Sequence, residues 1–281
     1  MSRKDKDKDK KKKKASAKSA PGIGNAVPDS EAEFLENYDA DDFERPSVTA
    51  DILVFTVRDD DLCLLLVKRG VHPFKGKWAL PGGFVRMDET AEDAARRELA
   101  EETGVTDAYV EQLYTFSAVD RDPRTRVISV AYFAAVPYER LSYEAGDDAS
   151  DAKLFRIEKD GGILRFVSDD GDSATDSELA FDHGEIVRTA VRRLRGKADY
   201  TNVIFRFLPD SSAVALPDLR RVYNAVAFRN LDNGNFSRWL LHRYMKKGEE
   251  TLVKTGESRR GSGGKGRNAV LYRLIETPEE D

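Results

Sequence analysis

The sequence predicts an α/β fold, in which a domain of strands and helices is followed by a winged helix-turn-helix. Strand-like and helical patterns alternate over residues 45–197. A helix, a turn, a second helix and a basic hairpin follow over residues 198–281. The chain of 281 residues is also longer than one typical domain of about 100–200 residues. We therefore expect two domains over these ranges, preceded by a separate lead-in.

Residues 1–44 form this lead-in, which we predict to be a disordered basic tail. Residues 1–19 contain ten Lys and Arg against three Asp, and the residues that follow are rich in Ala, Ser, Pro and Gly. A segment of this composition buries too little apolar surface to fold by itself. We favour a solvated tail, and nonspecific attraction to nucleic acid is the alternative.

The composition argues against a membrane span and a disulfide framework. No run of about 18 apolar residues occurs, and the lysine-rich start lacks the apolar stretch of a secretory signal. The single cysteine, Cys63, lies in an apolar run and is expected in the core. We therefore expect a cytoplasmic protein with no membrane partner.

The first domain is expected to begin with a β-hairpin. Residues 47–57 and 62–67 are rich in apolar residues, and three aspartates separate them as a turn. A helix is predicted over 90–103, because Thr90 can cap its start and Gly104 can end it in a left-handed conformation. Further strands are predicted over 109–118, 127–136, 152–157 and 163–167, and a last helix over 181–195.

The second domain is predicted to begin after a boundary near residues 196–200. An extended segment is expected over 202–207. Helices are predicted over 217–228 and 232–245, and strands over 251–255 and 269–275. A loop of Gly, Arg and Lys joins the two strands, and this order of elements is typical of a winged helix-turn-helix.

Three glutamates mark the candidate site of the first domain. On a helix, Glu98, Glu101 and Glu102 stand at positions i, i+3 and i+4 and share one face. Three like charges there repel one another, and a hard divalent cation such as Mg²⁺ or Mn²⁺ removes that cost. A cation held in this way can bind a pyrophosphate, polarise its phosphorus and lower the pKa of bound water.

The residues before the glutamates are expected to position them. Glu89 and Arg97 are predicted to form an ion pair that tethers the preceding loop to the helix. Gly82 and Gly83 permit close approach of the backbone to metal and phosphate. The segment matches the Nudix family signature at every fixed position, which comprises Gly83, Glu89, Arg97, Glu98, Leu99, Glu101, Glu102, Gly104 and Val105.

The resemblance to the Nudix family implies an α/β/α sandwich with a mixed sheet over about residues 45–197. It also implies hydrolysis of a nucleoside diphosphate linked to a further group. In family terms, Glu98 and Glu102 are the main metal ligands, and Glu101 and the carbonyl of Gly82 assist them.

The general base is assigned from the same resemblance. Some Nudix enzymes take it from the signature, where Glu101, Glu102 and Arg97 are the expected catalytic residues. ADP-ribose pyrophosphatases often take it from a later loop, and we choose Glu144 in the loop 139–151. A solvated loop carboxylate is the alternative for Glu144, and the other acidic residues of this loop are Glu139, Asp147 and Asp148.

The loop over residues 72–81 resembles the ADP-ribose-handling branch of the family. Phe74 or Trp78 is a candidate to pack against a base, and structural packing is the alternative. Arg69 and Lys77 are candidates to meet phosphates beside Gly83. His72 and His183 lack the spacing of metal ligands and are expected to be structural or peripheral.

The C-terminal part carries a candidate DNA-binding surface. Residues 214–273 contain thirteen Lys and Arg against five Asp and Glu, although the whole chain has a net charge of −5. Such a basic module suggests a polyanionic partner. The second predicted helix has an apolar side and a polar side suited to a major groove, and its loop can act as a wing on phosphates. The candidates are Asn235, Arg238, His242 and Lys246 on the helix, and Arg259, Arg260, Lys265 and Arg267 on the wing.

A Nudix domain joined to such a module resembles the Nudix-related transcriptional regulators of NAD metabolism. The resemblance covers about residues 45–275 and implies a homodimer that binds double-stranded DNA and responds to ADP-ribose or a related nucleotide. All signature glutamates are present, so we expect Mg²⁺-dependent hydrolysis together with regulation. The alternatives are a metabolic hydrolase whose C-terminal domain only dimerises, and a repressor that senses ADP-ribose without hydrolysing it.

Overall fold

The structure is a computed structural model that describes residues 30–143, 149–246, 251–259 and 268–275. The chain divides into two compact units, residues 1–45 and 46–281. In the first unit a short helix, α1 (Glu31–Asn37), begins after Ser30, whose hydroxyl accepts from the backbone N–H of Glu33. A single turn, η1 (Ala40–Asp42), follows it. The sequence analysis did not predict α1, and the lysine-rich residues 1–29 lie outside the described residues.

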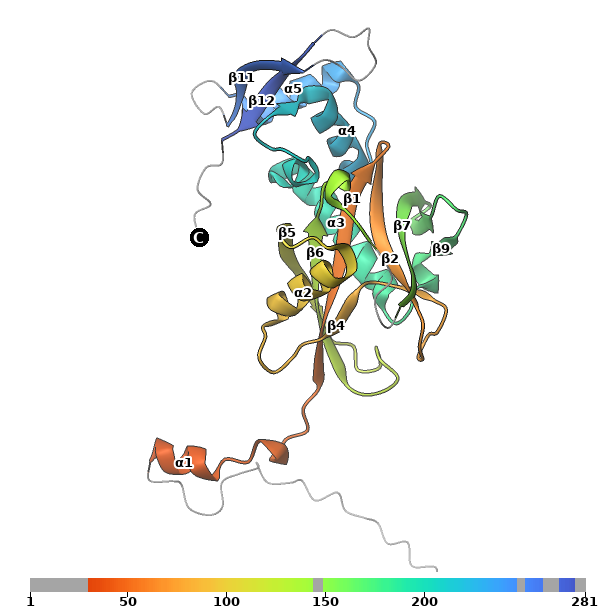
Figure 1. Cartoon of the computed structure of the whole chain (residues 1–281), viewed down its shortest axis with the longest axis vertical. Coiled ribbons are helices and arrows are strands. Elements are labelled where there is room, and N and C mark those ends of the chain that lie inside the picture. The colour runs from red at the N-terminus through yellow and green to blue at the C-terminus, as the bar shows by residue number, and fades with distance from the viewer. Residues whose placement is uncertain (1–29, 144–148, 247–250, 260–267, 276–281) are drawn as a thin grey trace, which may run out of the picture. The chain divides into compact units, whose positions relative to one another are not determined.

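A mixed sheet, nine-stranded among the described residues, forms the body of the larger unit (Figure 1). Its strands are β1 (Ser47–Arg58), β2 (Asp61–Arg69), β3 (Trp78–Ala79), β4 (Gly82–Phe84), β5 (Tyr109–Phe116), β6 (Val127–Ala135), β7 (Ala149–Asp160), β8 (Ile163–Val167) and β9 (Ser173–Thr175). The order is β5-β6-β1-β2-β7-β8-β9, with β3 beside β2 and β4 beside β1. Strand β1 is parallel to β6 and antiparallel to β2 and β4, so the predicted mixed sheet is confirmed.

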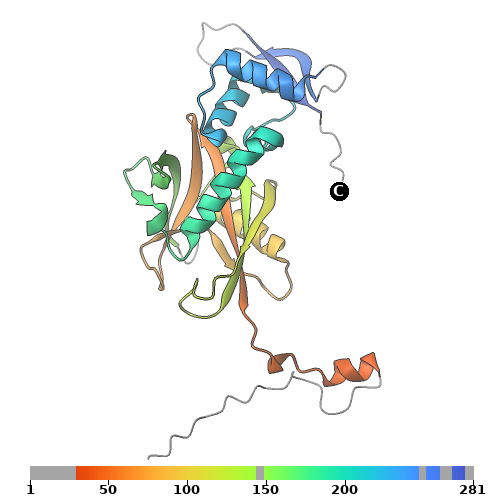
Figure 2. The same ribbon diagram turned by 180° about the vertical axis from the view of Figure 1, so that it is seen from behind.

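Helices α2 (Ala91–Thr103) and α3 (His183–Tyr200) cover opposite faces of this sheet (Figures 1 and 2). Side chains of β1 alternate between the two faces, as the geometry of a strand requires. Ile52 and Val54 belong to the core cluster of α2, whereas Leu53 and Phe55 belong to the cluster of α3. The α/β/α sandwich that the resemblance implied is therefore confirmed.

The local signals around the first two strands and α2 are also confirmed. Strands β1 and β2 form the predicted hairpin, and its turn residues Asp59 and Asp60 have φ angles of 49° and 75°. Thr90 caps α2 through a reciprocal pair of hydrogen bonds with Asp93. Gly104 ends the helix with a φ of 67°, and its N–H donates to the carbonyl of Ala100 at 2.8 Å.

Helix α3 is longer at its C-terminal end than the sequence suggested. It was predicted over 181–195 and forms over His183–Tyr200. The domain boundary placed between residues 197 and 198 falls inside this helix and stays a prediction. The segment 202–207, predicted as extended, is instead the 3-10 helix η4 (Val203–Phe207). A tight helical turn lets four apolar side chains of this segment enter the core, whereas an extended segment would have turned alternate ones outwards.

The winged helix-turn-helix is confirmed over the C-terminal part. Its elements are β10 (Val214–Ala215), α4 (Leu216–Ala227), α5 (Asn233–Tyr244), β11 (Leu252–Arg259) and β12 (Ala269–Leu274). The strands form a small sheet in the order β10-β12-β11. Tyr223 of α4 and Phe236 and Leu240 of α5 are buried between the helices. Helix α3 packs against α4 (Figure 2). Buried apolar residues of both parts belong to one cluster. Within the described ranges, the structure has no helix with the length and apolar character of a membrane span.

Candidate functional site

Strand β4 and helix α2 bound a cavity of about 510 Å³. Glu98, Glu101 and Glu102 line it from α2, and Gly82 and Gly83 line it from β4. Strand β4 is fixed there by antiparallel pairing with β1. The structure therefore brings the three predicted glutamates and the glycine pair to one cavity, whose remaining lining residues are Val67, Arg69, Ala79, Leu80, Pro81, Phe84 and Ala149.

Arg97 organises the carboxylates on this wall. Its Nε and Nη2 donate to the two carboxylate oxygens of Glu89 at 3.1 and 2.9 Å, so the predicted ion pair is confirmed. Its Nη1 donates to Glu98 at 2.7 Å and to Glu101 at 3.3 Å. The hydrogen bonds from Arg97 and from the backbone N–H of Arg86 lower the pKa of Glu89 to about 2. The loop before α2 is thus tied to the helix by a carboxylate that stays ionised.

Glu98 is more enclosed than Glu101. The Glu98 side chain is 12% exposed, against 54% for Glu101. Burial raises the pKa of Glu98, and the neighbouring Arg97 acts in the opposite direction. A Cβ on residue 83 would overlap Oε1 of Glu98 and would lie 3.0 Å from its Cδ. Glycine at position 83 therefore gives the Glu98 carboxylate the space in which it lies.

The donor set on this wall suits a hard divalent cation. Carboxylate oxygens and a backbone carbonyl are the ligands that Mg²⁺ and Mn²⁺ favour. Within the described ranges, no three His, Cys, Asp or Glu side chains are already gathered as a metal-binding group. Glu98 and Glu101 instead share Nη1 of Arg97 as their counter-charge.

A second cavity, of about 160 Å³, is the neighbour of the first, because Arg69, Leu80 and strand β4 line both. Basic side chains from three segments line it: Arg69, Arg121 and Arg124. The first cavity thus carries three glutamates, whereas the second adds Arg121 and Arg124 together with two aspartates. Its further lining residues are Thr49, Asp51, Val71, Asp122, Val127, Phe181 and His183.

A buried ionic network underlies the second cavity. Nε and Nη2 of Arg121 donate to the two carboxylate oxygens of Asp182 at 2.9 and 2.7 Å, and Nη2 donates to Asp51 at 3.4 Å. His183, at the start of α3, accepts through Nδ1 from the N–H of Leu80 at 2.9 Å. Burial lowers the pKa of His183, so its neutral form is favoured. The structural role expected for His183 agrees with this hydrogen bond, which links the cavity wall to α3.

Only some of the residues predicted to contact the substrate line the two cavities. Arg69 and Gly83 line the cavities. Trp78 is 7% exposed and packs edge-on against Phe155 with ring centroids 4.7 Å apart, so its side chain belongs to the core. Neither Phe74 nor Lys77 is among the described residues that line either cavity, and Lys77 lies over the Phe74 ring. Glu144 lies outside the described residues.

The phenylalanines and arginines of the two cavities include four that the sequence did not indicate, namely Phe84, Arg121, Arg124 and Phe181. Phe84 directly follows the glycine pair, and its place in the signature segment was the one signal that could have indicated it. Arg121 and Arg124 occur in a turn between strands, and Phe181 precedes α3. These three are far from the signature in sequence, and only the folded sheet brings them beside it.

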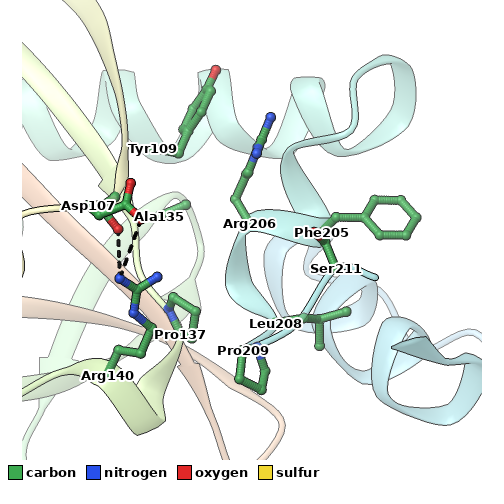
Figure 3. A pocket seen from close by; sticks show the side chains of 11 residues that line it. Asp107, Tyr109, Ala135, Pro137, Arg140, Phe205, Arg206, Leu208, Pro209 and Ser211 are labelled. Atoms are coloured by element: carbon green, nitrogen blue, oxygen red, sulfur yellow. Dashed lines mark hydrogen bonds and ion pairs between the residues drawn. The ribbon is translucent and has the colours of Figure 1, made fainter. Parts of the chain in front are cut away.

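A third cavity, of about 260 Å³, lies where β5, β6 and the segment after β6 approach η4 and the residues after it (Figure 3). Both arginines of this cavity contact other residues that line it. Arg140 donates to the carbonyl of Asp107 at 2.9 Å, and the guanidinium of Arg206 lies 5.6 Å from the centroid of the Tyr109 ring. Its lining contains none of the signature residues.

The candidate DNA-binding helix has the two faces that the sequence predicted. The residues proposed for DNA contact are exposed: Asn235, Arg238 and His242 on α5, and Lys246 just after it. Phe236, Leu240 and Tyr244 are buried on the opposite side. In the wing, Arg259 on β11 forms an ion pair with Asp218 of α4. Arg260, Lys265 and Arg267 lie outside the described residues.

Comparisons with known families agree with this architecture. Residues 46–167 match the NUDIX domain, and residues 204–274 match the NrtR DNA-binding winged helix domain. The two family matches thus coincide with the mixed sheet and with the winged helix-turn-helix of the structure.

Similar proteins match either most of the chain or about half of it. The ADPR responsive transcriptional repressor NtrR of Acinetobacter baylyi is 30% identical over 247 residues, which cover 87% of this chain and 88% of that protein. The ADP-ribose pyrophosphatase of Methanocaldococcus jannaschii is 38% identical over 151 residues, covering 54% of this chain and 76% of that protein. The structure of Shewanella oneidensis NrtR complexed with a 27mer DNA is 31% identical, has a TM-score of 0.60, and covers 81% of this chain and 93% of that one. The chain belongs to the NrtR family of Nudix-related transcriptional regulators.

Proposed function

We propose that this protein binds ADP-ribose at the Nudix site, hydrolyses it to AMP and ribose 5-phosphate with Mg²⁺, and regulates genes of NAD metabolism through its winged helix. The observation that carries the proposal is the pair of adjoining cavities, of which the first is lined by three glutamates and the second by three arginines, with Arg69 in both linings. The former suits a metal bound to a diphosphate, and the latter suits the anionic and planar parts of the same molecule.

Glu98 and Glu102 would hold the cation, assisted by Glu101 and the carbonyl of Gly82. The cation supplies a Lewis acid for the diphosphate and lowers the pKa of a bound water. Arg97 aligns Glu98 and Glu101 until the cation takes over their charge. Glu101 is exposed enough to accept a proton from water, and Glu144 is the second candidate for this role.

Arg69 would place the ligand. It lines both cavities, and a guanidinium matches a phosphate or a carboxylate through paired N–H donors. Arg121 is 4% exposed and is engaged by Asp182 and Asp51, so it positions the wall rather than contacting the ligand. Gly83 would bring the backbone close to the phosphate groups.

Helix α3 offers a route from this site to the DNA-binding part. Its first residue, His183, contacts the cavity wall. Near its other end, Asp199 accepts from the hydroxyl of Tyr223 at 2.7 Å and from Arg229 at 3.0 Å. The carbonyl of Asp199 also accepts from Arg243 of α5 at 2.6 Å. A ligand that shifts the start of α3 would therefore act on both helices of the winged part.

The exposed polar face of α5 supports major-groove binding by Asn235, Arg238, His242 and Lys246. Arg259, Arg260, Lys265 and Arg267 are proposed for the wing. A palindromic operator requires a two-fold symmetric protein, so we propose that the chain acts as a homodimer.

One experiment tests the two halves of this proposal together. Operator DNA and ADP-ribose are supplied to the same protein with and without Mg²⁺, and both AMP release and DNA retention are measured. We expect metal-dependent AMP release and a change in retention on operator DNA but not on random DNA at equal salt. Retention without AMP release would support a sensor that does not hydrolyse its ligand. AMP release without specific retention would support the hydrolase whose C-terminal part only dimerises.

A further inference from the structure

Two phenylalanines and an arginine bring planar side-chain groups to the second cavity. Phe84 reaches it from β4, Arg124 from the turn between β5 and β6, and Phe181 from the segment before α3. The Arg124 guanidinium lies 5.7 Å from the centroid of the Phe84 ring and 5.8 Å from that of Phe181. We call Phe84, Arg124 and Phe181 the aromatic clamp.

The cation of the clamp is held in place by a buried carboxylate. Nε and Nη2 of Arg124 donate to the two oxygens of Asp122 at 3.0 and 2.7 Å, and the Asp122 side chain is 4% exposed. The Arg124 side chain is 45% exposed, so its plane is accessible while its orientation is fixed. A flat cation fixed in this way can stack with an aromatic heterocycle.

The rings of the clamp differ from the buried aromatic residues of the core. Phe84 is 48% exposed although it is large and apolar. Phe181 has a φ of 51°, which is rare for a bulky residue, and backbone strain of this kind gathers at functional sites. Its ring is held by an edge contact with Phe74, 4.7 Å between centroids, and by Arg69 at 4.9 Å. The fold thus maintains an unfavourable conformation that places this ring at the cavity.

We propose that the aromatic clamp is the subsite for the purine base of the nucleotide. A base has the planar shape that two phenylalanine rings and a guanidinium can stack on, and stacking of this kind does not need a hydrogen-bonding partner. The first cavity, which adjoins the second along β4 and contains the three glutamates, then receives the diphosphate. This inference rests on the proposed function, because it assigns the nucleoside half of the same ligand.

The test compares ligands that differ only in the base. AMP and ribose 5-phosphate are titrated calorimetrically into the full chain, and ADP-ribose is titrated in EDTA so that it is not hydrolysed. Phe84→Leu should weaken AMP and ADP-ribose binding ~10-fold, the order expected for one stacked base, and should leave ribose 5-phosphate unchanged. Arg124→Lys keeps the charge and removes the planar group, so the same selective loss is expected.

Tyr114→Leu is the matched control, because Tyr114 is also an exposed aromatic residue of the sheet, 60% exposed, and does not line the cavity. It should bind all three ligands as the wild type does. Equal weakening of AMP and ribose 5-phosphate in either clamp variant would assign the clamp to the phosphate and overturn the inference. Unchanged AMP binding in both clamp variants would also overturn it. Wild-type protein that binds no ADP-ribose would instead contradict the proposed function.

Discussion

Gly83→Ala is the substitution that most sharply tests how Gly83 positions the carboxylate of Glu98, which with Glu101 and Glu102 forms the glutamate wall of the first cavity. The added methyl group would overlap Oε1 of Glu98 and would lie 3.0 Å from its Cδ. The atoms in the way are the far end of a flexible side chain, so Glu98 can rotate away and the backbone can stay. The variant should therefore fold, with its Glu98 carboxylate displaced from the cavity.

The expected losses of stability and of catalytic rate can both be estimated from these contacts. Displacement breaks the 2.7 Å hydrogen bond between Arg97 and Glu98, which should reduce the free energy of unfolding by about 1–2 kcal/mol. For a chain of this size, that corresponds to a Tm lower by about 2–8 °C. A catalytic group misplaced by about 1 Å can cost about 100-fold in rate, so kcat/KM for ADP-ribose should fall by that order.

AMP release with Mg²⁺ and thermal unfolding are measured on the same preparations. Gly196→Ala is the control, because its new Cβ would meet the Tyr200 ring at an ordinary 3.8 Å within α3. That variant should retain full activity and gain up to about 1 kcal/mol of stability. Gly82→Ala should instead lose stability, because its Cβ would lie 2.6 Å from the carbonyl oxygen of Ala50. A Gly83→Ala protein with wild-type activity and Tm would refute this placement of Glu98.

Three further predictions concern the metal site, the wing and the junction with α3. Glu101→Gln and Glu102→Gln should each lower AMP release at least ~100-fold, and unchanged rates in both would mean that these carboxylates are not at the reacting centre. Arg259→Ala should weaken DNA binding and flatten its dependence on salt by about one counterion, and an unaltered slope in a gel-shift titration would exclude a phosphate contact. Tyr223→Phe removes the 2.7 Å hydrogen bond to Asp199 and should lower the free energy of unfolding by about 1 kcal/mol without altering AMP binding, whereas an unchanged Tm would argue against this junction.

Residues that act through short-range patterns could be identified from the sequence alone. The spacing of Glu98, Glu101 and Glu102 places them on one helical face whatever surrounds the helix, and the structure finds all three at one cavity. The caps at Thr90 and Gly104 are equally local, and both were predicted. The two-faced character of α5 also follows from helical periodicity.

Residues that meet only through the folded sheet could not be identified in this way. Arg124 and Phe181 are separated in sequence by the strands β6, β7, β8 and β9, and no pattern links them to Phe84. Trp78 was a candidate for the ligand because it lies in a loop-like sequence, yet β3 pairs it with Lys68 and directs it into the core. Whether a side chain such as that of Trp78 is buried depends on which strand pairs with its own, and a single sequence does not reveal that pairing.

The glutamate wall of α2 is expected to bind a divalent cation beside the nucleotide. Anomalous diffraction from crystals containing Mn²⁺ and AMP tests it most directly. We expect an anomalous peak between β4 and α2, at ligand distance from Glu98 and Glu102, with Arg97 turned away from Glu98. Nucleotide bound in the cavities with no peak at these glutamates, or with Arg97 still bound to Glu98, would contradict the account.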